Sequence, residues 1–252
     1  MTSHTPEVEP ELLKGWLRRT IQHPEQDRLV LRGSMLTSTL CPGARRPVDL
    51  DHLVLGDFNS ADLLRLIHEI LSVPDPSTQL FFERSEIIWE DTAFPGVRVF
   101  LTGQVQDGDL QCFQIDFAFG DPLIHPPVQA FIPEVGPVPS CLPEILYAWK
   151  LHGLAEFGRG RWRAKDLYDL WVLAGLPMNL DLLNPALKVA FSSRGDDVGL
   201  LLDFHTRESW GCSTSGQRKW RTFLRRHQLT ADFLVCRTRV REVLSRLEGF
   251  HA

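Results

Sequence analysis

The chain has 252 residues, of which 43% are hydrophobic and 23% are charged. This composition is ordinary for a soluble globular protein and supports one large domain or two modest ones with hydrophobic cores. No apolar run approaches membrane-spanning length, and the first residues hold no basic cluster followed by an apolar segment. We therefore expect neither a membrane span nor a signal peptide, and we predict a cytoplasmic location.

The net charge of −5 is unevenly distributed along the chain. Residues 1–140 hold 10 Lys and Arg against 20 Asp and Glu, whereas residues 141–252 hold 17 against 12. Such a division suits an enzyme that binds metal through its first half and an anionic partner through its second half. The alternative is that these charged residues only form a solvated surface. Five scattered cysteines without a C-x-x-C pair, and histidines without metal-binding spacing, predict reduced thiols and neither a zinc site nor disulfides.

The first part of the chain predicts helices and a strand in turn. Apolar residues at helical spacing predict a helix over 10–22. The apolar stretch 29–33 predicts a strand that runs into a Gly-Ser turn, and 34–40 predicts a short helix. An Asn-Ser cap signal begins an amphipathic helix over 59–71.

The middle and end of the chain predict strands followed by helices. β-Branched and aromatic residues predict three strands, at 78–90, 97–105 and 109–119. We expect these strands to pair with the strand around Asp51 in a mixed sheet. The proline-rich stretch 125–143 predicts a linker or crossover. Helical patterns follow at 142–158, 164–175, 181–191, 215–229 and 230–250. The fold class is therefore α/β (α+β), an α/β half joined to a helical half.

The most informative motif is Gly33-Ser34 followed by Asp49-Leu50-Asp51. Alternate side chains of a strand project to the same face, so Asp49 and Asp51 can share a divalent cation, and carboxylate oxygens favour magnesium. Backbone N–H groups at a helix N-terminus approach phosphate oxygens closely where glycine lacks a Cβ, and Ser34 adds a hydroxyl donor. The motif predicts a phosphate site beside a magnesium site.

A third carboxylate, Asp116, lies in the middle of a predicted strand between apolar residues. A buried carboxylate is unfavourable unless it is paired or metal-bound, so we expect Asp116 to complete a metal triad with Asp49 and Asp51. Asp121 is the weaker candidate, because it precedes Pro122 in a G-D-P sequence and is predicted to be a turn residue.

A second signal extends from Lys150 to Leu170. Lys150 lies on one predicted helix, and a glycine-containing turn after it carries four basic residues, Arg159, Arg161, Arg163 and Lys165. Asp166 and Asp169 follow at helical spacing of three, so we expect them to share a face and to orient one basic side chain jointly. Lysine and arginine in this arrangement are candidates to hold triphosphate oxygens.

The order Gly-Ser, short helix, D-x-D strand and third aspartate resembles the nucleotidyltransferase fold shared by DNA polymerase β. With the K-L-H-G-L helix and R-x-K-D-L-Y-D-L, residues 28–175 resemble the AbiEii/AbiGii nucleotidyltransferase toxin family of bacterial abortive-infection and type IV toxin–antitoxin systems. The resemblance implies a polymerase-β-like mixed sheet with flanking helices in a domain over 1–135. A helical domain over 136–252 would complete the active-site cleft.

The same resemblance implies roles for individual residues. The implied catalytic residues are Asp49, Asp51, Asp116, Lys150 and Asp166. The implied nucleotide-binding residues are Gly33, Ser34, Lys150, Arg163, Lys165 and Asp169, and the implied metal ligands are Asp49, Asp51 and Asp116. It also implies two Mg²⁺ ions, an NTP substrate, RNA (first the 3′ end of tRNA) as acceptor, and a cognate antitoxin protein. The loop 41–47, CPGARRP, is either an extra substrate contact or an insertion.

Two other functions remain open from the sequence. One is nucleotidyl transfer to a small molecule, as in antibiotic-modifying relatives of this fold. The other is an inactive binding or regulatory module, which clustered carboxylates argue against because they repel one another without a metal. The basic stretch 218–227 supports an anionic partner, or it forms the outer face of a packed helix with Trp220, Phe223 and Leu224 toward the core.

Overall fold

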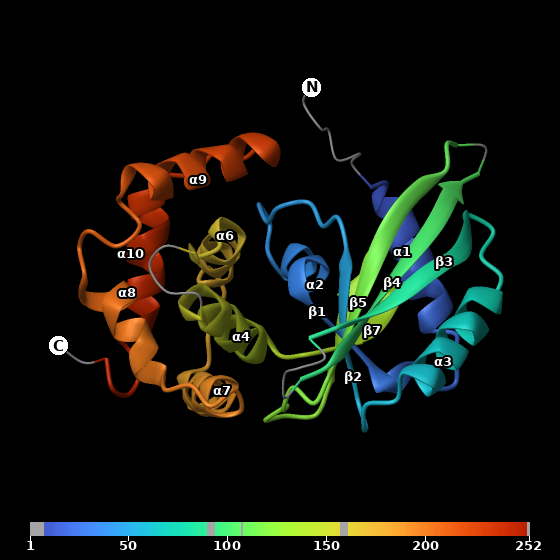
Figure 1. Ribbon diagram of the computed structural model, residues 1–252, viewed down its shortest axis with the longest axis horizontal. Coiled ribbons are helices and arrows are strands. Elements are labelled where there is room, and N and C mark those ends of the chain that lie inside the picture. The colour runs from blue at the N-terminus through green and yellow to red at the C-terminus, as the bar shows by residue number, and fades with distance from the viewer. Residues whose placement is uncertain (1–7, 90–93, 107, 157–160, 251–252) are drawn as a thin grey trace. The chain divides into compact units, whose positions relative to one another are not determined.

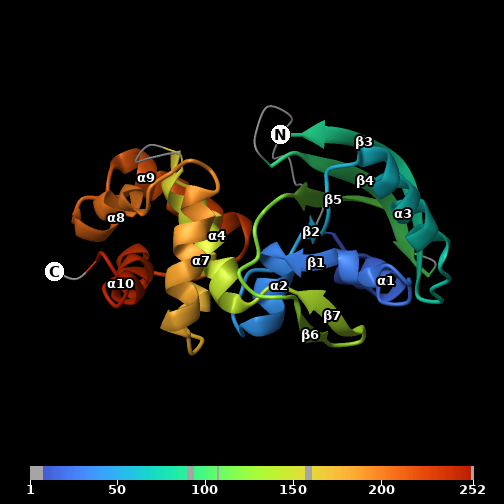
Figure 2. The ribbon, with the colours of Figure 1, turned by 90° about the horizontal axis from the view of Figure 1, so that it is seen from below.

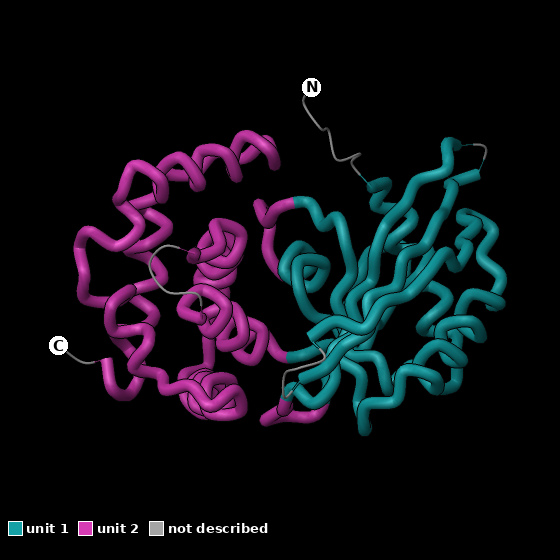
Figure 3. Tube along the Cα trace, in the orientation of Figure 1, with its two compact units in different colours: residues 1–39, 46–121, 127–141 teal, residues 40–45, 122–126, 142–252 magenta. Residues whose placement is uncertain are grey.

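The structure is a computed structural model that describes residues 8–89, 94–106, 108–156 and 161–250 (Figure 1). The chain divides into two compact units (Figure 3). Unit 1 comprises residues 1–39, 46–121 and 127–141, and unit 2 comprises residues 40–45, 122–126 and 142–252. Each unit therefore contains segments that are distant in sequence.

Unit 1 contains a mixed sheet with helices. Its elements in chain order are α1 (Pro10–Thr20), η1 (Gln26–Arg28), β1 (Leu29–Arg32), α2 (Gly33–Leu40), β2 (Leu50–Val54), α3 (Ser60–Ser72), β3 (Thr78–Ile88), β4 (Gly96–Val105), β5 (Gln111–Phe119), β6 (Val128–Ile132) and β7 (Gly136–Ser140). The described strands form one seven-stranded sheet in the order β3-β4-β5-β2-β1-β7-β6 (Figure 2). β2 is parallel to β5 and antiparallel to β1, so the predicted mixed sheet is confirmed.

Helices α1 and α3 pack together against β3, and α1 also contacts β4 (Figures 1 and 2). The Asn59 side chain caps α3 by accepting the Asp62 N–H at 3.0 Å, as the cap signal predicts. On α1 the Trp16 Nε1–H donates to His52 Nε2 at 3.1 Å, and His52 stacks on Phe117. Burial lowers the pKa of His52 to about 4, so its ring is neutral and accepts this bond.

This aromatic contact determines which face of the sheet carries the acidic motif. His52 and Phe117 lie on the face that Trp16 contacts. Neighbouring residues of a strand project to opposite faces, so Asp51 and Asp116 project from the other face.

The prediction of a linker over 125–143 is wrong, because this stretch forms the β6–β7 hairpin at the sheet edge. β7 contains Pro137 and Pro139, which alternate with Val138, the partner of Ala130 on β6. Alternate residues direct their N–H groups to the same side, and the Cys141 N–H donates to Leu31 on β1. The proline nitrogens therefore face β1 and leave the pairing with β6 intact.

Unit 2 is helical. Its elements are α4 (Pro143–Ala155), α6 (Ala164–Leu173), α7 (Leu180–Ser192), η2 (Val198–Leu201), α8 (Leu202–Thr206), α9 (Thr214–Arg226) and α10 (Phe233–Leu244). α4 packs on α6 and α7, and α6 also packs on α9 and α10. The core on the α9 side is aromatic, with Trp162, Trp210, Trp220 and Phe233 all at most 5% exposed. All the helices predicted for this half are confirmed.

In the described part of the chain no helix is long and apolar enough to cross a membrane. All five cysteines are free thiols, and Cys41, Cys141 and Cys236 are buried.

A buried ion pair holds α1 against the start of β3. The Asp75 carboxylate accepts Arg18 Nε at 2.9 Å and the Ser77 N–H at 2.8 Å, and it lies 3.3 Å from Arg19 Nη1. Arg19 is 4% exposed and also donates to the Thr78 backbone carbonyl at 2.6 Å. Burial raises the pKa of Asp75, but the bonds from Arg18 and Ser77 outweigh it, so the pKa lies below its usual range.

We expect Asp75→Asn to lower the free energy of unfolding by about 3 to 5 kcal/mol, because it leaves Arg19 buried without its carboxylate. Glu69→Gln, which removes the exposed partner of Arg65, is the control and should cost less than about 1 kcal/mol. Urea denaturation near neutral pH measures both. The pKa of Asp75 is lowered by folding, so its contribution is present above the ordinary Asp pKa of 3.8 and is lost as pH falls below it. The two proteins should therefore converge in acid, and a constant difference would contradict this account.

Candidate active site

The predicted Gly-Ser and D-x-D motifs lie together in unit 1. Gly33 begins α2 with φ +71°, and a Cβ placed on it would lie 1.9 Å from Asp51 Oδ2. Only glycine leaves room for that carboxylate and adopts this φ without strain. The Ser34 hydroxyl donates to Asp49 Oδ1 at 3.3 Å. Asp49 directly precedes β2, and Asp51 lies within it. The structure thus brings all four residues to the N-terminus of α2.

A row of charged residues crosses the sheet at the level of Asp51. Asp51 on β2 is the register partner of Arg32 on β1 and of Asp116 on β5. Asp116 is in turn the partner of Arg98 on β4, which pairs with Glu86 on β3. Register partners share a face of the sheet, so these five side chains project from the same face.

Asp51 and Asp116 are like charges on adjacent strands. Two unit charges at a strand spacing of about 4.8 Å repel by about 3.5 kcal/mol at an effective dielectric constant near 20. Arg98 offsets this repulsion with a bidentate pair to Asp116, with Nε to Oδ1 at 2.7 Å and Nη2 to Oδ2 at 2.8 Å. The hydrogen bond to Asp116 raises the pKa of Arg98. Arg98 therefore occupies both oxygens of the third carboxylate.

The residues fit a divalent cation in part. Asp49 and Asp51 supply hard carboxylate oxygens, and Gly33 leaves the space in which the Asp51 carboxylate lies. Among the described residues, however, no three His, Cys, Asp or Glu side chains form a group that could hold a metal ion. Asp116 is engaged by Arg98 and would have to exchange that partner to bind metal. The three metal assignments stay predictions.

Asp121 does more than form a turn. Its side chain is 1% exposed and forms an ion pair with Arg32. Burial lowers the pKa of Arg32, but Asp121 and Asp51 outweigh it, and the net direction is upward. Asp121 therefore holds the arginine that neighbours Asp51 in the charged row.

In unit 2, Asp169 is completely buried and pairs with two cations. Lys150 Nζ on α4 donates to Asp169 Oδ2 at 2.7 Å, and Arg45 Nε donates to Oδ1 at 3.1 Å. Burial raises the pKa of Asp169, but Lys150 and Arg45 outweigh it and lower the pKa overall. Arg45 comes from the loop 41–47, so this loop supplies a structural ion pair that neither reading of it predicted.

Asp166 has a different partner. Asp166 Oδ2 lies 2.6 Å from Arg163 Nε. The Arg163 guanidinium packs against Gly153 of α4, where an added Cβ would lie 2.3 Å from Arg163 Nη2. The expectation that Asp166 and Asp169 orient one basic side chain jointly is therefore wrong, because α6 directs them to separate cations. Arg159 lies outside the described residues.

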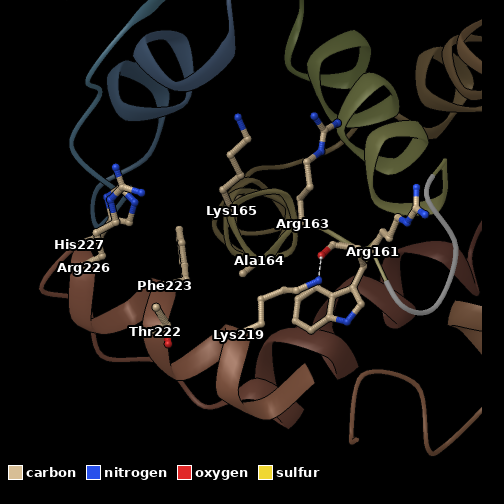
Figure 4. Close-up of a pocket in the computed structure, with 10 residues that line it drawn as sticks. Arg161, Arg163, Ala164, Lys165, Lys219, Thr222, Phe223, Arg226 and His227 are labelled. Atoms are coloured by element: carbon tan, nitrogen blue, oxygen red, sulfur yellow. Dashed lines mark hydrogen bonds between the residues drawn. The ribbon is translucent and has the colours of Figure 1, made fainter. Parts of the chain in front are cut away.

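Arg163 and Lys165 line a pocket of about 400 Å³ within unit 2 (Figure 4). The pocket lies between the start of α6 and the C-terminal half of α9. Of the basic turn, Arg161 also lines it. The sequence predicts these cations, but not that α9 would complete their surroundings.

Sequence reasoning missed the arginines that hold the acidic groups, namely Arg32, Arg98 and Arg45. A signal for two of them exists, because Arg32 ends the apolar strand LVLR and Arg98 interrupts the apolar stretch VRVFL. A charged residue in a buried strand usually has a charged partner. Arg45 lies in an irregular loop and offers no such signal.

The chain is similar to known proteins in sequence and in fold. Residues 16–245 match the family model described as nucleotidyl transferase AbiEii toxin of type IV toxin–antitoxin systems. MenT4, a nucleotidyltransferase toxin from Mycobacterium tuberculosis H37Rv, is 18% identical over 95% of this chain and 92% of its own, with a TM-score of 0.56, and shares the fold. JHP933 from Helicobacter pylori is 20% identical over 94% of each chain, with a TM-score of 0.47. No curated protein matches.

The family match extends over both units, from the α1 tryptophan Trp16 to the end of α10. It includes the Gly33 cradle and the Lys150 and Asp169 pair. The chain therefore belongs to the AbiEii family of nucleotidyltransferase toxins of type IV toxin–antitoxin systems.

Proposed function

We propose that this nucleotidyltransferase is metal-dependent and transfers nucleotides from an NTP to RNA, with the 3′ end of tRNA as the first candidate acceptor. The observation that carries the proposal is the cradle in which Asp51 lies against Gly33 at the start of α2. A helix N-terminus beside paired carboxylates suits a nucleoside triphosphate with its cation. The excess of cations over residues 141–252 supports an anionic acceptor.

Within unit 1, Asp49 and Asp51 would hold magnesium, with Asp116 as the third ligand. The bound cation would neutralise negative charge on the triphosphate and on the leaving pyrophosphate. The Ser34 hydroxyl and the backbone N–H groups at the start of α2 donate to phosphate oxygens. Asp116 would orient the acceptor hydroxyl and accept its proton at a carboxylate oxygen, which requires Arg98 to release that oxygen.

For the helical unit 2 we propose a supporting role in the same reaction. Lys150 contributes positive charge to the substrate phosphates, an effect of the kind that alters rates by roughly a hundredfold or more. Asp169 orients the Lys150 ammonium, and Asp166 orients Arg163. Arg163 and Lys165 belong to an anion-binding pocket.

The family implies a nucleotide substrate and an antitoxin partner. We propose that the antitoxin is encoded beside this gene, and that the protein acts in the cytoplasm, where both NTP and RNA are present. Sequencing the adjacent reading frame and coexpressing its product tests the first point.

The first prediction concerns the D-x-D carboxylates. Asp49→Ala and Asp51→Ala should each abolish transfer of labelled nucleotide to total tRNA in the presence of Mg²⁺, because each removes a ligand for the cation. Induced expression of the wild-type protein in bacteria should arrest growth, and expression of either alanine variant should not. Glu69→Gln on the exposed face of α3 is the control and should keep full activity. Full transfer by both alanine variants would disprove the metal assignment.

Transfer to a small hydroxylated compound in place of RNA would support the small-molecule alternative.

The second prediction concerns Gly33. Gly33→Ala should lower transfer by about a hundredfold or more, because its Cβ would displace the Asp51 carboxylate. Gly195→Ala is a matched control, since Gly195 has φ +72° and nothing within 4 Å of an added Cβ. Both substitutions share the strain of a positive φ, roughly 1 kcal/mol. Equal losses of activity in the two variants would mean that backbone strain, and not the cradle, explains the effect.

The third prediction concerns Arg98. Arg98→Gln should tighten Mn²⁺ binding by about fivefold or more, because it releases both Asp116 oxygens and removes a positive charge worth about 1 kcal/mol or more near the carboxylates. Calorimetry measures this in the absence of nucleotide. Arg84→Gln on β3 removes an exposed arginine as the control. Adding Asp116→Asn to Arg98→Gln should reverse the gain. Unchanged or weaker binding in Arg98→Gln would show that Arg98 does not compete with the cation.

A further inference from the structure

The pocket within unit 2 has a strongly basic lining. Five cations from two segments contribute to it, Arg161, Arg163, Lys165, Lys219 and Arg226. None of the residues that line it is acidic. Figure 4 shows Arg163 and Lys165 extending from the start of α6, while Arg226 lies at the end of α9. Arg163 is paired with Asp166, which does not line the pocket. An accumulation of cations in one pocket favours an anionic ligand.

His227 shares the pocket without adding charge at neutral pH. Burial, together with the cations Arg45 and Arg226, lowers the pKa of His227 below its usual range. The ring is therefore neutral and offers a hydrogen-bonding nitrogen among the cations. The positive charge of the pocket therefore comes from lysine and arginine alone.

The pocket also contains an aromatic surface. Phe223 lines it and is half-buried, and Trp162 also lines it and is 2% exposed. Lys219 Nζ donates to the Trp162 carbonyl at 3.0 Å, which places the ammonium 5.4 Å from the Trp162 ring centroid. An aromatic ring among cations is the surface on which proteins stack a base while they hold its phosphates.

The charge continues beyond the pocket along α9. This helix carries Arg218, Arg221 and Arg225 in addition to the two pocket cations, and it contains no acidic residue. Within the described part of the chain these three exposed arginines form no ion pair. Trp220 on the opposite face is buried. A compact nucleotide would fill the pocket and leave this row unused, whereas a strand with repeated phosphates uses both.

We propose that this pocket and the exposed basic face of α9 form one binding track for the phosphate backbone of an RNA strand, with Phe223 as a stacking surface for a base. The inference rests on the proposed RNA acceptor and adds the residues that bind it. The track binds RNA through phosphates and a ring, so it selects little sequence. It is a binding site, separate in its residues from the Gly33 and Asp51 motif.

The test is RNA binding measured apart from transfer. Lys165→Gln combined with Arg226→Gln removes one pocket cation from each segment. Fluorescence anisotropy with labelled tRNA, with EDTA present to prevent transfer, should show binding weakened by roughly tenfold. The slope of log affinity against log salt concentration should fall by about 1 to 2, because about two phosphate contacts are lost. Lys188→Gln combined with Arg246→Gln removes the same charge from exposed positions of the same unit and should change neither value.

Several results would overturn the proposal. RNA affinity unchanged in the pocket variant, or equal losses in the pocket and control variants, would show that the pocket makes no specific contribution. A matching loss of NTP binding, measured for each labelled NTP with Mg²⁺, would make the pocket part of the nucleotide site. Lys165→Arg combined with Arg226→Lys keeps the charge and should keep RNA binding, which distinguishes lost contacts from misfolding. The wild-type protein's failure to bind RNA overturns this inference, whereas failure to transfer to RNA it does bind overturns the proposed function alone.

Discussion

The acidic motif depends on how the sheet neutralises two carboxylates that its register places side by side. Asp51 and Asp116 lie on adjacent parallel strands, where like charges repel. Arg32 and Arg98 lie on the strands to either side, so each of the two carboxylates has a positively charged arginine as its other neighbour across the sheet. Without a cation, these arginines allow the acidic pair to exist in a folded sheet. The cation of the proposed reaction would compete with Arg98 for Asp116.

A similar arrangement occurs in unit 2, where complete burial makes a charged partner for the carboxylate more necessary. Asp169 is fully buried, so the free energy of an unpaired charge there would be prohibitive. Lys150 from α4 and Arg45 from the loop before β2 both pair with it. Lys150 therefore has a set orientation before any substrate binds. In both units the residues of the predicted chemistry are held by opposite charges, which is pre-organisation by ion pairing.

The two proposed anion sites differ in physical character. The start of α2 presents backbone N–H groups and a serine hydroxyl in a tight space defined by Gly33, which suits a few phosphate oxygens held close. The pocket beside α9 presents long, mostly exposed cations such as Lys165, which suit a flexible polyanion at lower precision. The proposed transfer of a nucleotide to RNA would use both kinds of site. The aromatic core under α9, in which Phe233 contacts Trp162, Trp210 and Trp220, supports the basic face from behind.

The sequence by itself determined the local elements and the identity of the acidic motif. Helix and strand periodicity, the Asn59 cap and the Gly33 to Asp51 pattern depend on residues that are close in the chain, and the structure has them as predicted. Tertiary structure alone decided the place of the β6–β7 hairpin beside β1 and the partners of most of the carboxylates. Arg45 and Asp169 are 124 positions apart. Such contacts depend on sheet register and helix packing, which local patterns do not encode. Of the ion pairs described at the candidate site, only Arg163 with Asp166 joins residues of one helical turn.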